Sequence, residues 1–281
     1  MKYFEKPSDI RPGSTMSSIQ GIRPTMEDRH TVATYENLEF FGIFDGHGGE
    51  DVADFVSNEL AKHLLPVFAA REKKGSTIAE LGQTVRQVYR DLDKSMFEQK
   101  FEAGSCALVA IFDRVSLDMF VINLGDSRAF LFTEECRQLL ETFEKSPADP
   151  DERQRIENSE HVVLKPCSVD RIDGHLAVSR AFGDIDLKTP KLDSNQYTQS
   201  KGAVSAVPIF HHINLKPNKR YFLILACDGF WTDGGITNPF TETELMHMIA
   251  RRGLHAVDLT NEALRRGSGD NITTMLICFN L

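Results

Sequence analysis

Hydrophobic residues recur at helical spacing in three parts of the chain. Two runs place apolar residues three or four positions apart, and the second continues for about five turns. The residues of the two runs are Val52, Phe55, Val56, Leu60, Leu64 and Leu65, and then Ile78, Leu81, Val85, Val88, Leu92 and Met96. A third helical stretch is predicted from Leu245 onward, with Thr241 or Thr243 as its N-cap. Each of these helices is expected to bury one face.

Runs rich in β-branched and aromatic residues are predicted to be strands. They span Leu38–Phe44, Ser105–Phe112, Asp118–Asn123, Ala129–Phe132, Ala206–Ile213, Tyr221–Ala226 and Ile272–Phe279. Several are joined by short connections, and a short connection pairs strands antiparallel, since parallel strands need a crossover of about a dozen residues. The pattern predicts an α+β fold in which helices cover antiparallel sheets, not a doubly wound parallel sheet. Residues 149–195 are expected to form loops with one short helix around Glu152–Glu157.

Acidic residues stand at the ends of several predicted strands. Asp45 and Asp228 each terminate an apolar run and precede a glycine, and Asp270 stands just before the last strand. An Asp-Gly pair alone is ordinarily a turn, but antiparallel strands can bring all three carboxylates to one edge. Converging carboxylates repel one another unless a multivalent cation holds them. Oxygen ligands without a Cys/His pair favour Mg²⁺ or Mn²⁺ over Zn²⁺.

Two further segments carry groups suited to phosphate chemistry. Arg23 lies close in sequence to the adjacent acids Glu27 and Asp28, and its planar guanidinium suits a phosphate. The alternative is an ordinary surface salt bridge between Arg23 and Glu27. His47 is flanked by glycines and has no apolar face to fill, which favours a role in proton donation.

Composition narrows the class of protein. The chain has 281 residues, 41% hydrophobic and 26% charged, which excludes disordered, collagen-like and disulfide-scaffold proteins. No linker-like break divides it, so we expect one domain over residues 1–281. A net charge of −9 disfavours nucleic acid, and no apolar run approaches the roughly 20 residues of a membrane span. Scattered cysteines and no secretory leader indicate a cytoplasmic or nuclear protein with reduced thiols, and we expect a monomer.

Several motifs together resemble one known family, the metal-dependent serine/threonine protein phosphatases of type 2C (PPM). They occur in the family's order over nearly the whole chain, while the motifs of phosphate loops, zinc helices and esterase elbows are absent. The motifs are Arg23-Pro24-Thr25-Met26-Glu27-Asp28, Phe44-Asp45-Gly46-His47-Gly48-Gly49, Gly104-Ser105-Cys106-Ala107, Asn123-Leu124-Gly125-Asp126-Ser127-Arg128, Leu176-Ala177-Val178-Ser179-Arg180-Ala181-Phe182-Gly183-Asp184, Ala226-Cys227-Asp228-Gly229-Phe230-Trp231 and Ser268-Gly269-Asp270-Asn271. The resemblance implies a four-layer sandwich of two antiparallel β-sheets flanked by α-helices.

The resemblance also implies a role for each site residue. Asp45 would bridge two Mg²⁺ or Mn²⁺ ions, Asp228 and Asp270 would complete the first ion, and the Gly46 carbonyl would reach the second. Glu27 and Asp28 would act on the second ion, largely through its waters. Arg23 would hold the phosphate of a phosphoprotein substrate, and His47 would protonate the leaving serine or threonine oxygen. Hydroxide would attack phosphorus directly, without a phosphoenzyme.

The chain departs from the family pattern in two places. Glu144 replaces an aspartate, and Asp233 stands one position late after Trp231. Because the displaced acids belong to a weaker third metal site in the family, we expect a third ion to be loosened or moved toward Glu144 and Asp233. Asp126 is expected to be structural, Asp184 to order a loop beside the site, and residues 185–203 to form a flap that helps choose substrates.

Two other functions are considered beside the active phosphatase. A catalytically weakened pseudophosphatase acting as a binding scaffold is the main alternative, because Glu144 and Thr232 differ from the family pattern. A nuclease or other phosphoester hydrolase is disfavoured by the acidic charge balance.

Overall fold

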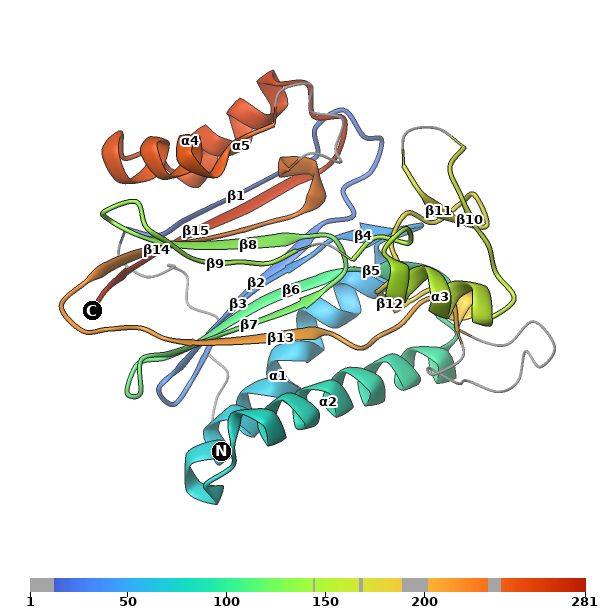
Figure 1. The fold of residues 1–281 in the computed structure, drawn as a ribbon, viewed down its shortest axis with the longest axis horizontal. Helices are drawn as coiled ribbons and strands as arrows, with labels where there is room; N and C mark the ends of the chain where they lie inside the picture. The colour runs from blue at the N-terminus through green and yellow to red at the C-terminus, as the bar shows by residue number, and fades with distance from the viewer. Residues whose placement is uncertain (1–12, 144, 167–168, 189–201, 232–238) are drawn as a thin grey trace.

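The computed structural model describes residues 13–143, 145–166, 169–188, 202–231 and 239–281. Figure 1 shows four layers from top to bottom: a helical layer, two β-sheets and a second helical layer. The four-layer α+β architecture predicted from the sequence is confirmed, and every pair of neighbouring strands within its sheets is antiparallel. Among the described residues, no helix has the length and apolar character needed to span a membrane.

Each of the two large sheets has five strands. The first has the order β13 (Ile209–Asn214), β7 (Asp118–Leu124), β6 (Ala107–Asp113), β3 (Leu38–Phe44) and β2 (Arg29–Tyr35). The second has the order β1 (Thr15–Ile19), β15 (Ile272–Asn280), β14 (Arg220–Ala226), β8 (Arg128–Thr133) and β9 (Gln138–Glu141). The strand expected at Ala206–Ile213 begins later than predicted, at Ile209. Pro208 precedes it and has no N–H to donate to a ladder.

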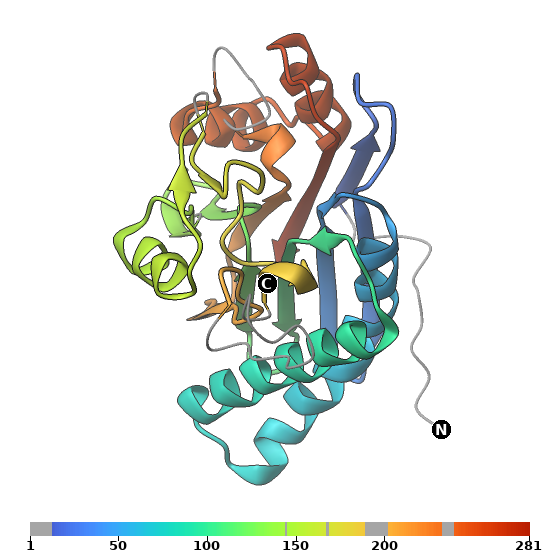
Figure 2. The same ribbon diagram turned by 90° about the vertical axis from the view of Figure 1, so that its right-hand side faces the viewer.

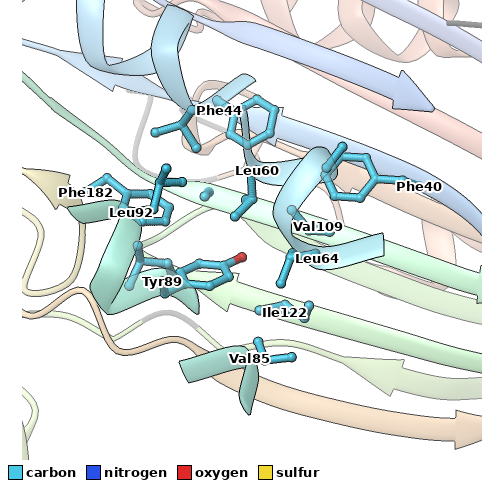
Figure 3. Close-up of a cluster of buried hydrophobic side chains, with 14 of the residues drawn as sticks. Phe40, Phe44, Leu60, Leu64, Val85, Tyr89, Leu92, Val109, Ile122 and Phe182 are labelled. Carbon is cyan, nitrogen blue, oxygen red and sulfur yellow. The ribbon is translucent and has the colours of Figure 1, made fainter. Parts of the chain in front are cut away.

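Helices cover the outer face of each sheet. One sheet packs against α1 (Asp51–Lys74) and α2 (Ile78–Gln99), which form the two predicted apolar stripes (Figure 3). The other packs against α4 (Glu242–Met246), its π-helical continuation η3 (His247–Arg251) and α5 (Ala256–Arg265). Thr77 caps α2 and Thr241 caps α4, as expected for threonine at a helix start.

The alternation of side chains explains why β3 is buried along its whole length. Successive side chains in a strand point to opposite faces. Phe40 and Phe44 pack against the helices, whereas Phe41 and Ile43 pack against the second sheet. The strand therefore stays in the core as far as Phe44, and Asp45 follows it directly where the chain leaves the core.

Short elements gather at one end of the sandwich, which Figure 2 turns toward the viewer. Residues 149–195 were expected to be loops with one short helix. The structure has α3 (Pro150–Asn158) there, together with the short strands β10 (Val163–Leu164), β11 (Arg171–Ile172) and β12 (Phe182–Gly183) and the 3₁₀ turn η1 (Ile185–Leu187). β12 joins β5 (Gly104–Ser105) and β4 (Gly46–His47) in a small sheet. Two-residue strands are too short to show an alternating pattern of hydrophobic residues, so the sequence could not predict them.

Candidate active site

Strand ends from both large sheets line one cavity of about 660 Å³. Asp45 follows β3, Asp228 follows β14 at the start of the 3₁₀ turn η2 (Asp228–Phe230), and Asp270 precedes β15. All three line the cavity, together with Arg23, Glu27, Gly46 and His47. The structure thus brings these distant sequence segments together at one edge of the sandwich, with Asp28 buried close to Asp45.

Asn271 fixes the loop that carries Arg23 and Glu27. Its side-chain amide donates to the carbonyls of Gln20 and Thr25 at 2.8 and 2.9 Å, and its oxygen accepts from the Glu27 N–H at 2.8 Å. Every polar atom of this amide therefore ties the loop to the start of β15. The sequence placed Asn271 in a motif but gave it no role.

Burial, reinforced by like-charge repulsion, dominates the electrostatics of the cavity. Burial raises the pKa of Asp45 well above its usual range, and the nearby Asp228 carboxylate raises it further. Burial and the Asp126 carboxylate raise the pKa of Asp228 in the same way. Burial raises the pKa of Asp28 to about 6, against the hydrogen bond it accepts from the Thr273 hydroxyl at 2.7 Å. The protein alone therefore does not compensate these charges.

The donor set fits a hard divalent cation. Oxygens of Asp28 and Asp45 and the sulfur of Cys227 lie within 4.8 Å of one another. Burial raises the pKa of the Cys227 thiol well above its usual range, so this sulfur stays protonated and is a poor metal ligand. The carboxylates are then the ligands available, which suits Mg²⁺ or Mn²⁺.

A backbone close approach explains the glycine after Asp45. A Cβ at Gly46 would lie 2.6 Å from the Glu27 carbonyl oxygen, too close for any side chain. The glycine lets the chain after β3 lie directly against the Glu27 loop, so the backbone of residue 46 lines the cavity.

His47 pairs with Asp184 from a different part of the chain. Its Nε2 lies 2.9 and 3.0 Å from the two carboxylate oxygens. Burial lowers the pKa of His47, but the Asp184 carboxylate outweighs it, and the pKa ends above the usual value. The pair packs over Gly104, where a Cβ would lie 2.2 Å from Nε2 and 2.3 Å from an Asp184 oxygen. Asp184 was expected only to order a nearby loop; the structure also makes it the partner of His47.

Arg23 lies on the rim of the cavity and contacts the start of β15. Its Nη2 donates to Asp270 at 2.5 Å, and its Nε donates to the Gly269 carbonyl at 3.2 Å. The guanidinium forms its ion pair with Asp270. The alternative considered from the sequence was a surface salt bridge between Arg23 and Glu27. About half of the side chain is exposed. The group is held toward the cavity and can still meet an incoming anion.

Asp126 also lines the cavity, although the sequence favoured a structural role for it. Its Oδ1 accepts from the Cys106 thiol at 3.2 Å, and its charge raises the pKa of Asp45 and Asp228. A signal was present, because Asp126 follows an apolar strand just as Asp45 and Asp228 do. Glu144, Asp233 and residues 189–201 of the expected flap lie outside the described residues.

Removing the metal should make stability fall as pH rises. Asp28, Asp45 and Asp228 have raised pKa values, so the folded protein keeps protons that the unfolded chain releases above about pH 4. Stability therefore falls from about pH 4 to about pH 6, the pKa of Asp28, and keeps falling above pH 6 until Asp45 and Asp228 also lose their protons. Thermal unfolding in chelator, at pH values on either side of 6, measures this trend.

The variant Asp28→Asn is the control for this trend, because it should flatten part of the pH dependence. Saturating Mn²⁺ should reverse the sign, since the cation replaces the protons. A metal-free protein whose stability rises through this pH range would contradict the interpretation.

Known proteins are similar to this chain over most of its length. The family model described as Protein phosphatase 2C matches residues 13–272. Protein phosphatase 1B of Mus musculus is 32% identical over 292 residues, covering 94% of this chain and 70% of its own length. The Homo sapiens protein of the same name is 31% identical over 291 residues, and the chain spans only 57% of it. The match covers the same 94% of this chain.

Solved structures show the same fold. A serine-threonine phosphatase 2C from Toxoplasma gondii superimposes with a TM-score of 0.75 at 24% identity, covering 99% of this chain and 98% of that one. Another phosphatase from a pathogenic strain of Toxoplasma gondii gives 0.78 at 24% identity, covering 95% and 93%. The chain belongs to the protein phosphatase 2C family of metal-dependent serine/threonine protein phosphatases.

Proposed function

We propose that this chain hydrolyses phosphoserine and phosphothreonine on proteins in the 660 Å³ cavity, with two Mg²⁺ or Mn²⁺ ions and no phosphoenzyme. The observation that carries the proposal is the cluster of Asp45, Asp228 and Asp28, where burial and neighbouring carboxylates raise the pKa of each group and a divalent cation would offset the repulsion. Bound there, such a cation pair supplies hydroxide at neutral pH and neutralises charge on the phosphoryl group.

The ligand assignment follows the strand ends. Asp45 feels the charges of Asp228, Asp28 and Asp270, and it would be the ligand shared by both ions, with Asp228 and Asp270 on the first and the Gly46 carbonyl on the second. Glu27 and Asp28 would act on the second ion, largely through its waters, and Asn271 holds the Glu27 backbone at the cavity. Asp126 contributes further negative charge to the same wall.

Arg23 binds the substrate phosphate in this proposal, so Arg23→Ala should raise KM for a phosphothreonine peptide by about 10- to 100-fold. Charge-assisted hydrogen bonds of this kind contribute about 1.5–3 kcal/mol. The value of kcat should change less. Arg23→Lys keeps the charge but loses the planar fork, so it should recover only part of the affinity. Initial-rate kinetics with the peptide measure this, and an unchanged KM in Arg23→Ala would exclude a phosphate-binding role.

His47 donates a proton to the leaving oxygen. Asp184 lies against Nε2, so the proton available to the substrate is the one on Nδ1. The same carboxylate raises the pKa of His47 and keeps the ring protonated to higher pH. Serine and threonine leave as alkoxides unless they are protonated, which is why these substrates need the donor.

Phosphate release from a phosphothreonine peptide tests the whole proposal. Release should require Mn²⁺ or Mg²⁺ and should stop when a chelator is added. A protein that binds Mn²⁺ by calorimetry but releases no phosphate from a panel of phosphopeptides would favour the scaffold function instead.

A further inference from the structure

A fully buried ion pair contacts the turn that carries Asp184, the partner of His47. Asp93 of α2 and Lys188 have side chains that are 0% exposed, with Nζ and Oδ1 2.7 Å apart. Burying two charges costs more free energy than their attraction returns unless further hydrogen bonds satisfy them. Here Lys188 also donates to the Ala181 carbonyl at 2.7 Å, and Asp93 accepts the Gly183 N–H at 2.9 Å.

All these contacts act on the turn formed by residues 181–184. Gly183 has φ +71° and Asp184 has φ +46°, a left-handed conformation that residues with a side chain rarely adopt. Such a backbone persists only where its surroundings hold it. Besides the ion pair, the Asp184 N–H donates to the Ala103 carbonyl at 3.0 Å.

Packing from α2 holds the same turn. Tyr89, one helical turn before Asp93, stacks on Phe182 with ring centroids 4.9 Å apart (Figure 3). Tyr89 and Asp93 are four residues apart and so lie on one face of α2. A helix that never reaches the cavity thereby holds the backbone from which Asp184 extends to His47.

We propose that Asp93 and Lys188 are positioning residues for proton transfer: their buried ion pair fixes the 181–184 turn so that the Asp184 carboxylate meets His47. This inference rests on the proposed role of His47 as proton donor. A purely structural pair could be replaced by apolar side chains of similar volume without changing the chemistry. A positioning pair could not, because the Gly183 N–H and the turn would lose their anchor.

The leaving group of the substrate distinguishes the two roles. An alkoxide from phosphothreonine needs a proton from the enzyme, whereas p-nitrophenolate is already a stable anion. The double variant Asp93→Leu/Lys188→Met removes both charges together and leaves none unpaired. We expect its kcat on a phosphothreonine peptide to fall at least about tenfold more than its kcat on p-nitrophenyl phosphate. Asp93→Asn keeps an acceptor for Gly183 and should show a smaller shift in the same direction.

A second ion pair serves as the matched control. Arg71 of α1 and Asp118 of β7 lie 2.7 Å apart, distant in sequence from the turn. Arg71→Met/Asp118→Leu should lower the melting temperature. It should leave unchanged the ratio of kcat on the phosphothreonine peptide to kcat on p-nitrophenyl phosphate. If the Asp93 and Lys188 double variant folds by circular dichroism, binds Mn²⁺ and also keeps the wild-type ratio, the inference is overturned. If it does not fold, the ratio in Asp93→Asn decides in the same way.

His47→Gln separates this inference from the proposed function. If His47→Gln leaves the substrate ratio unchanged, proton donation by His47 is wrong, and the inference falls with it. If His47→Gln shifts the ratio while the Asp93 variants do not, only the positioning role is wrong. A shift in both sets of variants supports both statements.

Discussion

Asp45→Asn should abolish Mn²⁺ binding and lower phosphopeptide turnover by at least about 10³-fold, while making the metal-free protein more stable. Asp45 lies among Asp228, Asp28, Asp126 and Asp270, all of which raise its pKa. Replacing the carboxylate with an amide removes the proposed shared ligand, and with it the metal charge that would stabilise the reacting phosphate. It also removes a carboxyl group that the metal-free folded protein must keep protonated at neutral pH, which lowers its stability relative to the unfolded chain.

The loss of function and the gain in stability of Asp45→Asn are measured in separate experiments. Calorimetric titration with Mn²⁺ and phosphate release report the functional loss. Thermal unfolding in chelator reports the gain in stability of Asp45→Asn over the wild type. In Mn²⁺ the wild type should be the more stable of the two proteins, because only the wild type gains stability from binding. Asp91→Asn, on the exposed face of α2, changes the formal charge equally and should alter neither. An Asp45→Asn protein with full Mn²⁺-dependent activity would refute the metal site.

The sequence predicted best those helices and strands in which one pattern of hydrophobic residues extends over many positions. The α2 stripe and the apolar runs of β3 and β14 are long enough to show their helical or strand character, and their ends locate Asp45 and Asp228. The four-layer sandwich came from the family resemblance, whereas the order of these runs predicted only antiparallel sheets covered by helices. Antiparallel pairing then made it reasonable to expect the acids at one edge.

The sequence was uninformative where contacts depend on tertiary structure. Asp184 meets His47 across 137 positions, and Lys188 meets Asp93 across 95. No local period encodes such a contact, since each depends on how β12 pairs with β5 in the folded chain. Asn271 was likewise missed, because an amide that ties two loops together has the same sequence appearance as any turn residue. The acids at strand ends could therefore be predicted from the sequence, whereas the tertiary contacts that position Asp184 and the Glu27 loop could not.

His47→Gln should lower kcat for phosphothreonine peptides by about 10²- to 10⁴-fold, the usual contribution of a general acid. Its effect on p-nitrophenyl phosphate should be much smaller, because that leaving group needs no proton. Gln keeps a polar group near Asp184 but cannot deliver a proton, and Mn²⁺ affinity should change little because the carboxylate ligands remain. A wild-type pH profile for peptide hydrolysis should therefore lose activity at high pH, as His47 deprotonates above its raised pKa.

That high-pH limb should move to lower pH in Asp184→Asn, because the carboxylate is what raises the pKa of His47 against the effect of burial. His63→Gln, on the exposed surface of α1, is the matched control and should leave the profile unchanged. Metal-bound water also titrates, so the p-nitrophenyl phosphate profile is needed for comparison: a limb seen with both substrates belongs to the metal site. A limb seen only with the peptide belongs to the proton donor. Equal losses on both substrates in His47→Gln would show instead that His47 acts on phosphate or metal binding, and that another group protonates the leaving oxygen.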